Sequence, residues 1–258
     1  MGGAFHGKGR VGTRGVSARA QRKAAVSARR RPGTSRASRS GKAAPVDLET
    51  KKLPSQARSR STFDAILRVA GEILNDDGLD GLSINAVCRQ AGLTPPAVYR
   101  YFPNKYALLK ALAERLMEAQ DDVVLAVTRR RPPAQSEPAL AEEMREVLRE
   151  VAAVTAGFPG NVFILRALRV TPILRDVRRA STAKVAAQRV DRLRSVFPAA
   201  DLAALRRGVW LGIETANALI ELIAEREWEV VGESRQATIE AAGGLIAHHY
   251  WQLCGEAS

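Results

Sequence analysis

The side chains of this sequence that could do chemistry are better suited to binding than to catalysis. There is no G-x-S-x-G nucleophile motif, no H-E-x-x-H pair and no phosphate-binding P-loop. The chain has three histidines, two of them adjacent, and two cysteines, Cys88 and Cys254, which lie far apart without metal-ligand spacing. We therefore expect a protein that is not an enzyme and that has no metal site and no cofactor.

A dense group of hydrogen-bonding side chains lies between Ser83 and Lys105. Ser83 can cap a short helix, because its hydroxyl accepts from the unpaired amides of the first turn. Gly92 can adopt the left-handed backbone that ends this helix. Thr94 can cap a second short helix with Pro95 at its first position, where the missing amide hydrogen would have had no partner. Two such helices joined by a short glycine turn are typical of a helix-turn-helix.

The second of these helices, from Thr94 to Tyr101, is expected to lie in the major groove of DNA with its first residues against base edges. Adjacent prolines offer only apolar contact there, for instance to a thymine methyl group, whereas an arginine can hydrogen-bond guanine. The residues expected to read bases are Pro95, Pro96, Ala97 and Arg100. Because these offer few hydrogen bonds, we expect DNA shape to contribute to specificity.

The same stretch resembles the DNA-binding signature of the TetR (tetracycline repressor) family of bacterial transcription regulators. The resemblance rests on the fixed spacing of a turn, an aromatic block and a lysine over about 23 residues: Ser83, Ala91-Gly92-Leu93-Thr94, Tyr99-Arg100-Tyr101-Phe102 and Lys105. It is strong from roughly Phe63 to Leu112 and only architectural beyond. The resemblance implies DNA contact by Ser83 and phosphate contacts by Thr94, Tyr99, Tyr101 and Lys105.

Positive charge is concentrated at the amino terminus. Residues 1–60 contain 16 Lys and Arg against two acidic residues, a net charge of +14, so residues 61–258 carry −1 of the total of +13. Because large apolar side chains are scarce there, we expect residues 1–56 to be a disordered basic tail. The tail could neutralise DNA phosphates without reading sequence, or it could be a solvated extension. Arg58 and Arg60 are expected to reach a DNA groove or phosphate.

Helical periodicity through the rest of the chain indicates an all-α fold, without the alternating pattern of strands. Ser61 is expected to open the first helix, whose apolar stripe runs from Phe63 to Leu74. We expect a three-helix helix-turn-helix domain at residues 57–108 and a carboxy-terminal helical bundle at residues 109–258. The later helices are expected at residues 105–128, 137–156, 161–170, 171–196, 201–228 and 234–253.

Three arginines, Arg129 to Arg131, end the helix that begins at Lys105. Cations are favoured at this end because the helix dipole is negative there. We interpret these arginines as helix-end residues in preference to a DNA-binding patch.

The last two long helices suggest a dimer. The helix from residue 201 is apolar on two sides, and the last helix places small residues, Ala241 to Gly244, beside large apolar ones. By resemblance, these helices would pair with their twofold mates in a homodimer; the alternative is that both faces are core of one subunit. The resemblance also implies a small-molecule inducer held by the carboxy-terminal helices. Candidate contacts, mostly polar or aromatic, are Phe158, Phe163, Arg166, Trp210, Glu214 and Asn217.

For Arg166 and Glu214, solvation or pairing with each other is the alternative to a ligand contact. Taken together, the residues and the resemblance predict a sequence-specific DNA-binding transcriptional regulator, a ligand-responsive repressor that binds a near-palindromic operator in double-stranded DNA. We expect it to be cytoplasmic and nucleoid-associated when bound to DNA, since no stretch is apolar and long enough to span a membrane. The alternatives are a non-specific DNA-compacting protein that acts through its basic tail, and a helical-bundle enzyme that uses paired acidic residues.

Overall fold

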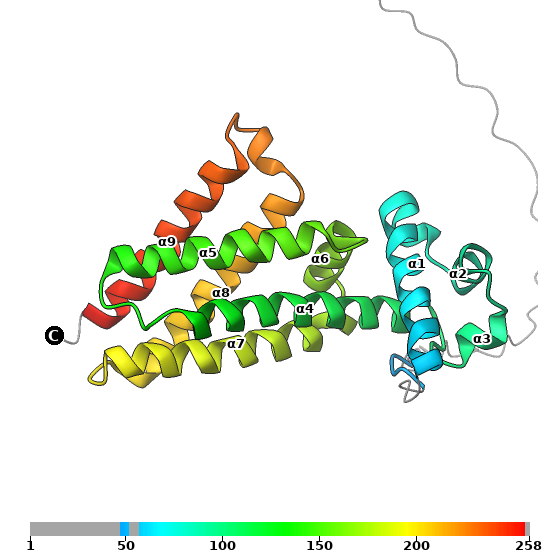
Figure 1. Ribbon diagram of the computed structural model, residues 1–258, viewed down its shortest axis with the longest axis horizontal. Helices are drawn as coiled ribbons and strands as arrows, with labels where there is room; N and C mark the ends of the chain where they lie inside the picture. The colour runs from blue at the N-terminus through cyan, green and yellow to red at the C-terminus, as the bar shows by residue number, and fades with distance from the viewer. Residues whose placement is uncertain (1–46, 52–56, 256–258) are drawn as a thin grey trace, which may run out of the picture. The chain divides into compact units, whose positions relative to one another are not determined.

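The computed structural model describes residues 47–51 and 57–255 of the 258-residue chain. Within these ranges the ordered elements are helical and no strand occurs, which confirms the predicted all-α class (Figure 1). Residues 1–46, which hold most of the predicted tail, and the side chain of Arg58 lie outside the described residues.

The helix-turn-helix predicted from the sequence forms as three amino-terminal helices followed by a longer bundle. The amino-terminal helices are α1 (Ala57–Gly81), α2 (Ile84–Ala91) and α3 (Pro95–Tyr99). The bundle consists of α4 (Lys105–Arg130), α5 (Glu137–Ala156), α6 (Asn161–Val170), α7 (Arg175–Val196), α8 (Leu202–Ala224) and α9 (Arg235–Gly255), with short 3-10 turns η1 (Pro172–Leu174) and η2 (Glu227–Glu229).

Three of the predicted helix-end residues in the DNA-binding part act as expected. The Ser83 hydroxyl accepts from the amide of Ala86 at 3.1 Å, and Gly92 adopts a left-handed φ of 65°. Asn104 caps α4 through its side-chain oxygen. The expected cap by Thr94 is wrong in detail, because Thr94 occupies the N-cap position of α3 but its side chain makes no capping hydrogen bond.

The first helix is longer than the sequence predicts. It begins at Ala57 instead of Ser61, so Ser61 lies inside the helix, and Asp64 forms an ion pair with Arg115 of α4. At the other end, the helical path is interrupted at Gly78, where φ is 66° and ψ is −164°. A side chain at this position would lie 3.2 Å from the ring of Phe163, so glycine permits both the backbone turn and the packing of α6 against it.

Aromatic side chains hold the end of α3 against α1. The ring of Phe102 is fully buried and stacks on Phe63 with ring centroids 5.0 Å apart. Tyr101 packs edge-on against the same Phe63 ring at 5.7 Å. The prediction that Phe102 belongs to the core is confirmed. The ring of Phe63 in α1 thus holds Tyr101 and Phe102, the residues that follow α3.

Helix α4 belongs to both parts of the molecule. Its first turns contact α1, and its later turns pack against α5 and α7 (Figure 1). The proposed division between residues 108 and 109 therefore falls in the first turn of one continuous helix. No single helix among the described residues is long and apolar enough to cross a membrane; α5 and α6 pass that test only as a pair, bent by 108°.

A buried carboxylate ties the far end of α4 to α5 and α7. Glu143 of α5 is 1% exposed and accepts from Arg189 Nη1 at 2.6 Å and from Arg192 Nη2 at 3.1 Å. The Arg192 guanidinium also donates to the carbonyls of Arg131 and Pro132, at 3.0 and 2.8 Å. The Glu143 carboxylate thus binds two arginines of α7, and one of them, Arg192, also binds the connection that follows α4.

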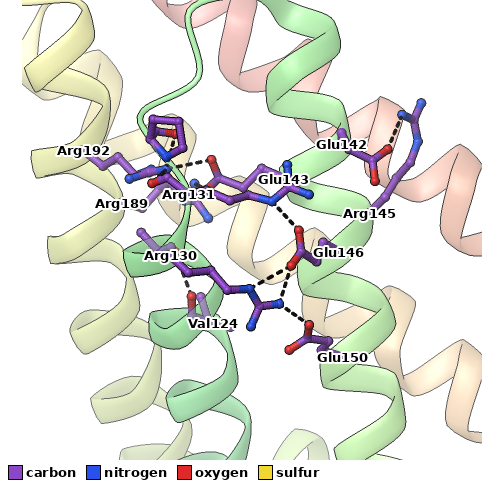
Figure 2. Close-up of polar contacts among 12 residues, drawn as sticks. Val124, Arg130, Arg131, Glu142, Glu143, Arg145, Glu146, Glu150, Arg189 and Arg192 are labelled. Atoms are coloured by element: carbon purple, nitrogen blue, oxygen red, sulfur yellow. Dashed lines mark hydrogen bonds and ion pairs between the residues drawn. The ribbon is translucent and has the colours of Figure 1, made fainter.

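The interpretation of Arg129 to Arg131 as helix-end cations was incomplete. Figure 2 shows the guanidinium of Arg130 between the carboxylates of Glu146 and Glu150 on α5. Arg131 contacts the second oxygen of Glu146. Hydrogen bonding to Arg130 lowers the pKa of Glu146 below its ordinary value. Arg130 and Arg131 therefore join the end of α4 to α5 in addition to facing the helix dipole.

We predict that Glu143→Ala destabilises the protein by about 3–5 kcal/mol, because it leaves the buried Arg189 guanidinium without its carboxylate. Chemical denaturation measures the change. The matched control is Glu142→Ala, whose half-exposed carboxylate makes only a long ion pair with Arg145, and which should cost less than about 0.5 kcal/mol. Replacing both members of the pair, Glu143→Leu with Arg189→Met, should recover most of the lost free energy of unfolding. If Glu143→Ala and Glu142→Ala destabilised the protein equally, the structural role of the buried Glu143–Arg189 pair would be contradicted.

Candidate nucleic-acid interface and ligand-binding surfaces

The outer face of α3 presents most of the residues predicted to contact DNA. Val98 is fully buried, so the opposite face of α3 is the one that meets solvent. Tyr99 is 44% exposed, and the neighbouring Arg100 is also exposed. The predicted DNA-contact residues that are exposed or half-buried here are Ser83, Thr94, Pro95, Pro96, Ala97, Tyr99, Arg100 and Lys105. The structure thus brings eight of the predicted residues to the surface of α2, α3 and the start of α4.

Lys105 lies at the first position of α4, beside the end of α1. Its ammonium group is 3.5 Å from the carbonyl of Leu79 and 5.8 Å from the ring centroid of Tyr106. An anion placed there would meet both a cation and the positive end of a 26-residue helix. The geometry therefore suits a phosphate.

Tyr101 is placed differently from the expected phosphate contact. Its ring is 3% exposed, and its hydroxyl lies 2.8 Å from the hydroxyl of Ser59 in the first turn of α1. The hydroxyl therefore already has a protein partner. Tyr101 fixes the first turn of α1, and with it Arg60, next to the end of α3.

The segment ahead of α1 makes contacts that no sequence pattern indicated. The amide of Lys51 donates to the carbonyl of Tyr101 at 2.9 Å. The side chain of Asn104 donates to the carbonyl of Asp47 at 2.6 Å, and Lys110 of α4 pairs with Glu49 at 2.7 Å. Residues 47–51 therefore lie along the connection between α3 and α4.

The residues predicted to bind a ligand do not form one pocket. Phe158 lines a small groove with Asp64 and Leu67, and Phe163 packs against the kink of α1. Arg166 pairs with Glu225 at 2.6 Å, so the predicted alternative partner, Glu214, is not the one it uses. The six candidates are spread over several places in the bundle.

Two of the candidates, Trp210 and Glu214, share a groove of 610 Å³ between α7, α8 and the end of α6. Glu214 accepts from Arg178 at 3.0 Å. Arg178 also contacts Glu221 at 3.1 Å, and Arg169 contacts the second oxygen of Glu221 at 3.1 Å. The groove is therefore lined by ion pairs between arginine and glutamate side chains.

Asn217 lines a different space, a cavity of 80 Å³ inside the bundle. Its wall includes Asp121 of α4, a buried carboxylate that accepts from Ser181 at 2.7 Å and lies 3.4 Å from the ammonium group of Lys184. Burial raises the pKa of Asp121 above its ordinary value, and hydrogen bonding to Ser181 opposes that shift. The adjacent Gln120 donates to Thr155 of α5 at 2.7 Å. The sequence signal for this polar layer was the pair Gln120-Asp121 in a helix whose inner face is otherwise apolar.

Comparison with known proteins supports the assignment of the amino-terminal part. A family model described as "Bacterial regulatory proteins, tetR family" matches residues 66–112. The tetracycline repressor protein class C of Escherichia coli is 44% identical over 54 residues, which are 21% of this chain and 25% of the repressor. The HTH-type transcriptional regulator YvdT of Bacillus subtilis is 35% identical over 65 residues, 25% of this chain and 32% of that protein. The chain thus spans about a quarter to a third of the length of these relatives.

Solved structures resemble the fold over a larger part of the chain. A tetR-family transcriptional regulator from Streptomyces coelicolor superposes with a TM-score of 0.56 at 18% identity, covering 77% of this chain and 82% of that one. The fatty acid degradation regulator FadR from Bacillus halodurans gives a TM-score of 0.54 at 15% identity, with 76% and 97% covered. At such low identity these likenesses show the arrangement of helices.

We predict that Asp121→Asn raises the melting temperature at pH 7. Because the pKa of Asp121 is raised in the folded state, the folded protein disfavours the ionised carboxyl, and this penalty is present above the ordinary carboxyl pKa of about 3.9. The advantage of the variant should shrink as the pH falls toward 4, where the wild-type carboxyl becomes protonated. Thermal unfolding at several pH values measures it, with Asp122→Asn as the exposed control. A lower melting temperature of Asp121→Asn than of the wild type at pH 7 would contradict this prediction. It would show that the attraction between Asp121 and Lys184 stabilises the fold by more than burial of the charge destabilises it.

Proposed function

Because the chain belongs to the TetR family of bacterial regulatory proteins, we propose that it is a sequence-specific DNA-binding transcriptional regulator, a repressor whose affinity for DNA responds to a small molecule. The observation that carries this proposal is the exposed face of α3, which presents Tyr99 and Arg100 beside Lys105 within the segment that matches the family. An exposed recognition helix with donors at its edges is suited to the major groove.

The contacts divide into those that position the protein and those that read bases. The phosphate contacts are assigned to Ser83, Thr94, Tyr99 and Lys105, and the base contacts to Pro95, Pro96, Ala97 and Arg100. The guanidinium of Arg100 lies 5.9 Å from the ring of Tyr101, whose hydroxyl is held by Ser59. Tyr101 is therefore proposed to orient Arg100 from the core. Arg60 is proposed to reach the phosphates or groove next to α3.

A homodimer would supply two such helices. Large apolar side chains are exposed on neighbouring faces of α8 and α9: Leu211 is 49%, Leu222 45% and Leu245 59% exposed. These two helices pack against each other, and we propose that the three leucines belong to one dimer surface. A homodimer that buries this surface would carry two recognition helices. Helix-turn-helix dimers bind half-sites about 34 Å apart, so such a dimer would select a near-palindromic operator.

The response to a ligand is proposed to pass through α4. This helix carries Lys105 at the DNA end and Asp121 in the bundle, where Ser181 and Lys184 of α7 hold it. A ligand that binds one arrangement of α7 more tightly than another shifts the position of α4 and of Lys105. The protein is proposed to act in the cytoplasm.

The alternative function, non-specific DNA compaction by the basic tail, makes a different prediction. It requires that affinity depend on the +14 charge of residues 1–60 and be indifferent to DNA sequence. The relatives named above are a repressor and transcriptional regulators, which favours sequence-specific binding.

We predict that Arg100→Ala relaxes discrimination at one operator position by about 1–3 kcal/mol, since it removes a bidentate contact to guanine. Tyr99→Ala should weaken binding to all sequences alike, because a phosphate contact carries no sequence information. Selection from a random DNA pool, followed by footprinting and affinity measurement, tests both variants.

The control is Arg194→Ala, which removes an exposed arginine near the end of α7 and should leave affinity unchanged. Equal loss of affinity on every sequence with Arg100→Ala would contradict its role in reading bases. Binding indifferent to sequence, and abolished by deletion of residues 1–55, would instead support the compaction function.

We predict that Leu245→Glu converts the dimer to a monomer, because it places a charge in the centre of a surface that must be desolvated. Sedimentation analysis should show half the mass, and operator affinity should fall steeply as the paired half-sites are lost. Val170→Glu is the control, since Val170 is 74% exposed at the end of α6, a helix that carries none of the three leucines. A dimer that survives Leu245→Glu would exclude this interface.

A further inference from the structure

The groove between α7, α8 and the end of α6 has the size of a small-molecule site. Its volume is 610 Å³, within the roughly 300–1,000 Å³ of typical ligand pockets. One stripe of α8 forms a wall, in which Trp210, Glu214, Ala218 and Glu221 recur at helical spacing. This stripe lies beside the one that carries Leu211 and Leu222, which belong to the proposed dimer surface.

The acidic groups of the groove are already neutralised. Glu221 is 6% exposed and is held by Arg169 and Arg178, both at 3.1 Å. Glu214 is held by the second terminal nitrogen of Arg178 at 3.0 Å. A cationic ligand would therefore have to break an existing pair to reach either carboxylate.

The basic groups of the groove are in excess. Four arginines line it against two glutamates. Arg175 forms no ion pair within the described part of the chain, and Arg179 has only a long contact of 3.5 Å with Asp176, in which both side chains are largely exposed. Such an exposed pair contributes little. Two arginines one helical turn apart on α7 are thus available to an anion, and a carboxylate is a common partner of guanidinium groups.

The part of the groove formed by α8 also offers an apolar surface. The indole of Trp210 is 52% exposed, although a large aromatic side chain gains from burial. A planar ring laid against it would cover this surface. Trp210 and the two arginines line the same groove, Trp210 from α8 and the arginines from α7.

We propose that this groove binds a small aromatic carboxylate, with its carboxylate on Arg175 and Arg179 and its ring against Trp210. The arginines supply charge-assisted hydrogen bonds, and the indole supplies the apolar contact. We also assign this compound as the ligand that alters DNA binding, a step that rests on the proposed function. It would act on α7, the helix that holds Asp121 of α4 through Ser181 and Lys184.

The test is isothermal titration calorimetry of the full chain, without DNA, with 2-naphthoate as the probe and the uncharged 2-naphthamide as its matched control. The wild-type protein should bind the carboxylate at least about tenfold more tightly than the amide. Arg175→Gln with Arg179→Gln should remove most of that preference. The control, Arg206→Gln with Arg207→Gln, removes the same charge from exposed positions of α8 outside the groove and should change the affinity less than about twofold.

Three results would overturn the binding site: no heat with 2-naphthoate, equal affinity for the amide, or an unchanged affinity in the Arg175/Arg179 variant. A loss of dimer in that variant, seen by sedimentation, would mean that the acidic segment around η2 of a second copy fills the groove, and would also overturn it. Binding of 2-naphthoate that left operator affinity unchanged would refute only its regulatory role. Failure of the ligand-free protein to select any DNA sequence would refute the proposed function and leave the binding result standing.

Discussion

The requirement that buried polar groups be paired determines how this bundle is assembled. Helix α4 has neither glycine nor proline inside it and runs without interruption from Lys105 to Arg130. Along it, Asn104 satisfies the first amides, Asp121 is met by Ser181, and Arg130 is met by Glu146. Because Ser181 belongs to α7 and Glu146 to α5, these polar contacts fix the position of α4 against its neighbours more specifically than apolar packing alone does.

The DNA-binding helices depend on the same helix. Asp64 of α1 pairs with Arg115 of α4, and the ring of Phe63 lies between Phe102 and the Arg115 guanidinium, which is 5.4 Å from its centroid. The recognition helix α3 has only five residues and is too short to be stable alone. Its end is held because Tyr101 and Phe102 pack against Phe63 of α1, whose ring Arg115 of α4 also contacts. A shift of α4 is therefore carried to α3 through side chains in direct contact.

The parts of the fold that could be predicted from sequence are those controlled by neighbouring residues in the chain. The Ser83 cap, the left-handed Gly92 and the cap at Asn104 are local, and they appear as expected. The partners of charged residues are not local. Nothing near Glu143 in the sequence indicates Arg189, 46 residues later, and the pattern around Tyr101 does not distinguish a phosphate contact from a hydrogen bond to Ser59. The six residues predicted to bind a ligand lie in several places for the same reason. Helical periodicity identifies which face of a helix is buried, but not which other helix covers that face.

The arginines of α7 fall into two groups, those that pair with carboxylates inside the bundle and those that are free to bind an anion. Arg189 faces a buried carboxylate and cannot be recruited by a ligand without exposing Glu143. Arg178 is committed to two glutamates at once. Arg175 and Arg179 are exposed on α7, and no carboxylate of α8 pairs with either of them. An anion that binds these two arginines therefore adds a contact to α7 without dismantling the pairs that hold α7 to α4 and α5. Binding and stability can in this way be carried by different charges of one helix, which allows a ligand to bias the position of α7 while the bundle stays folded.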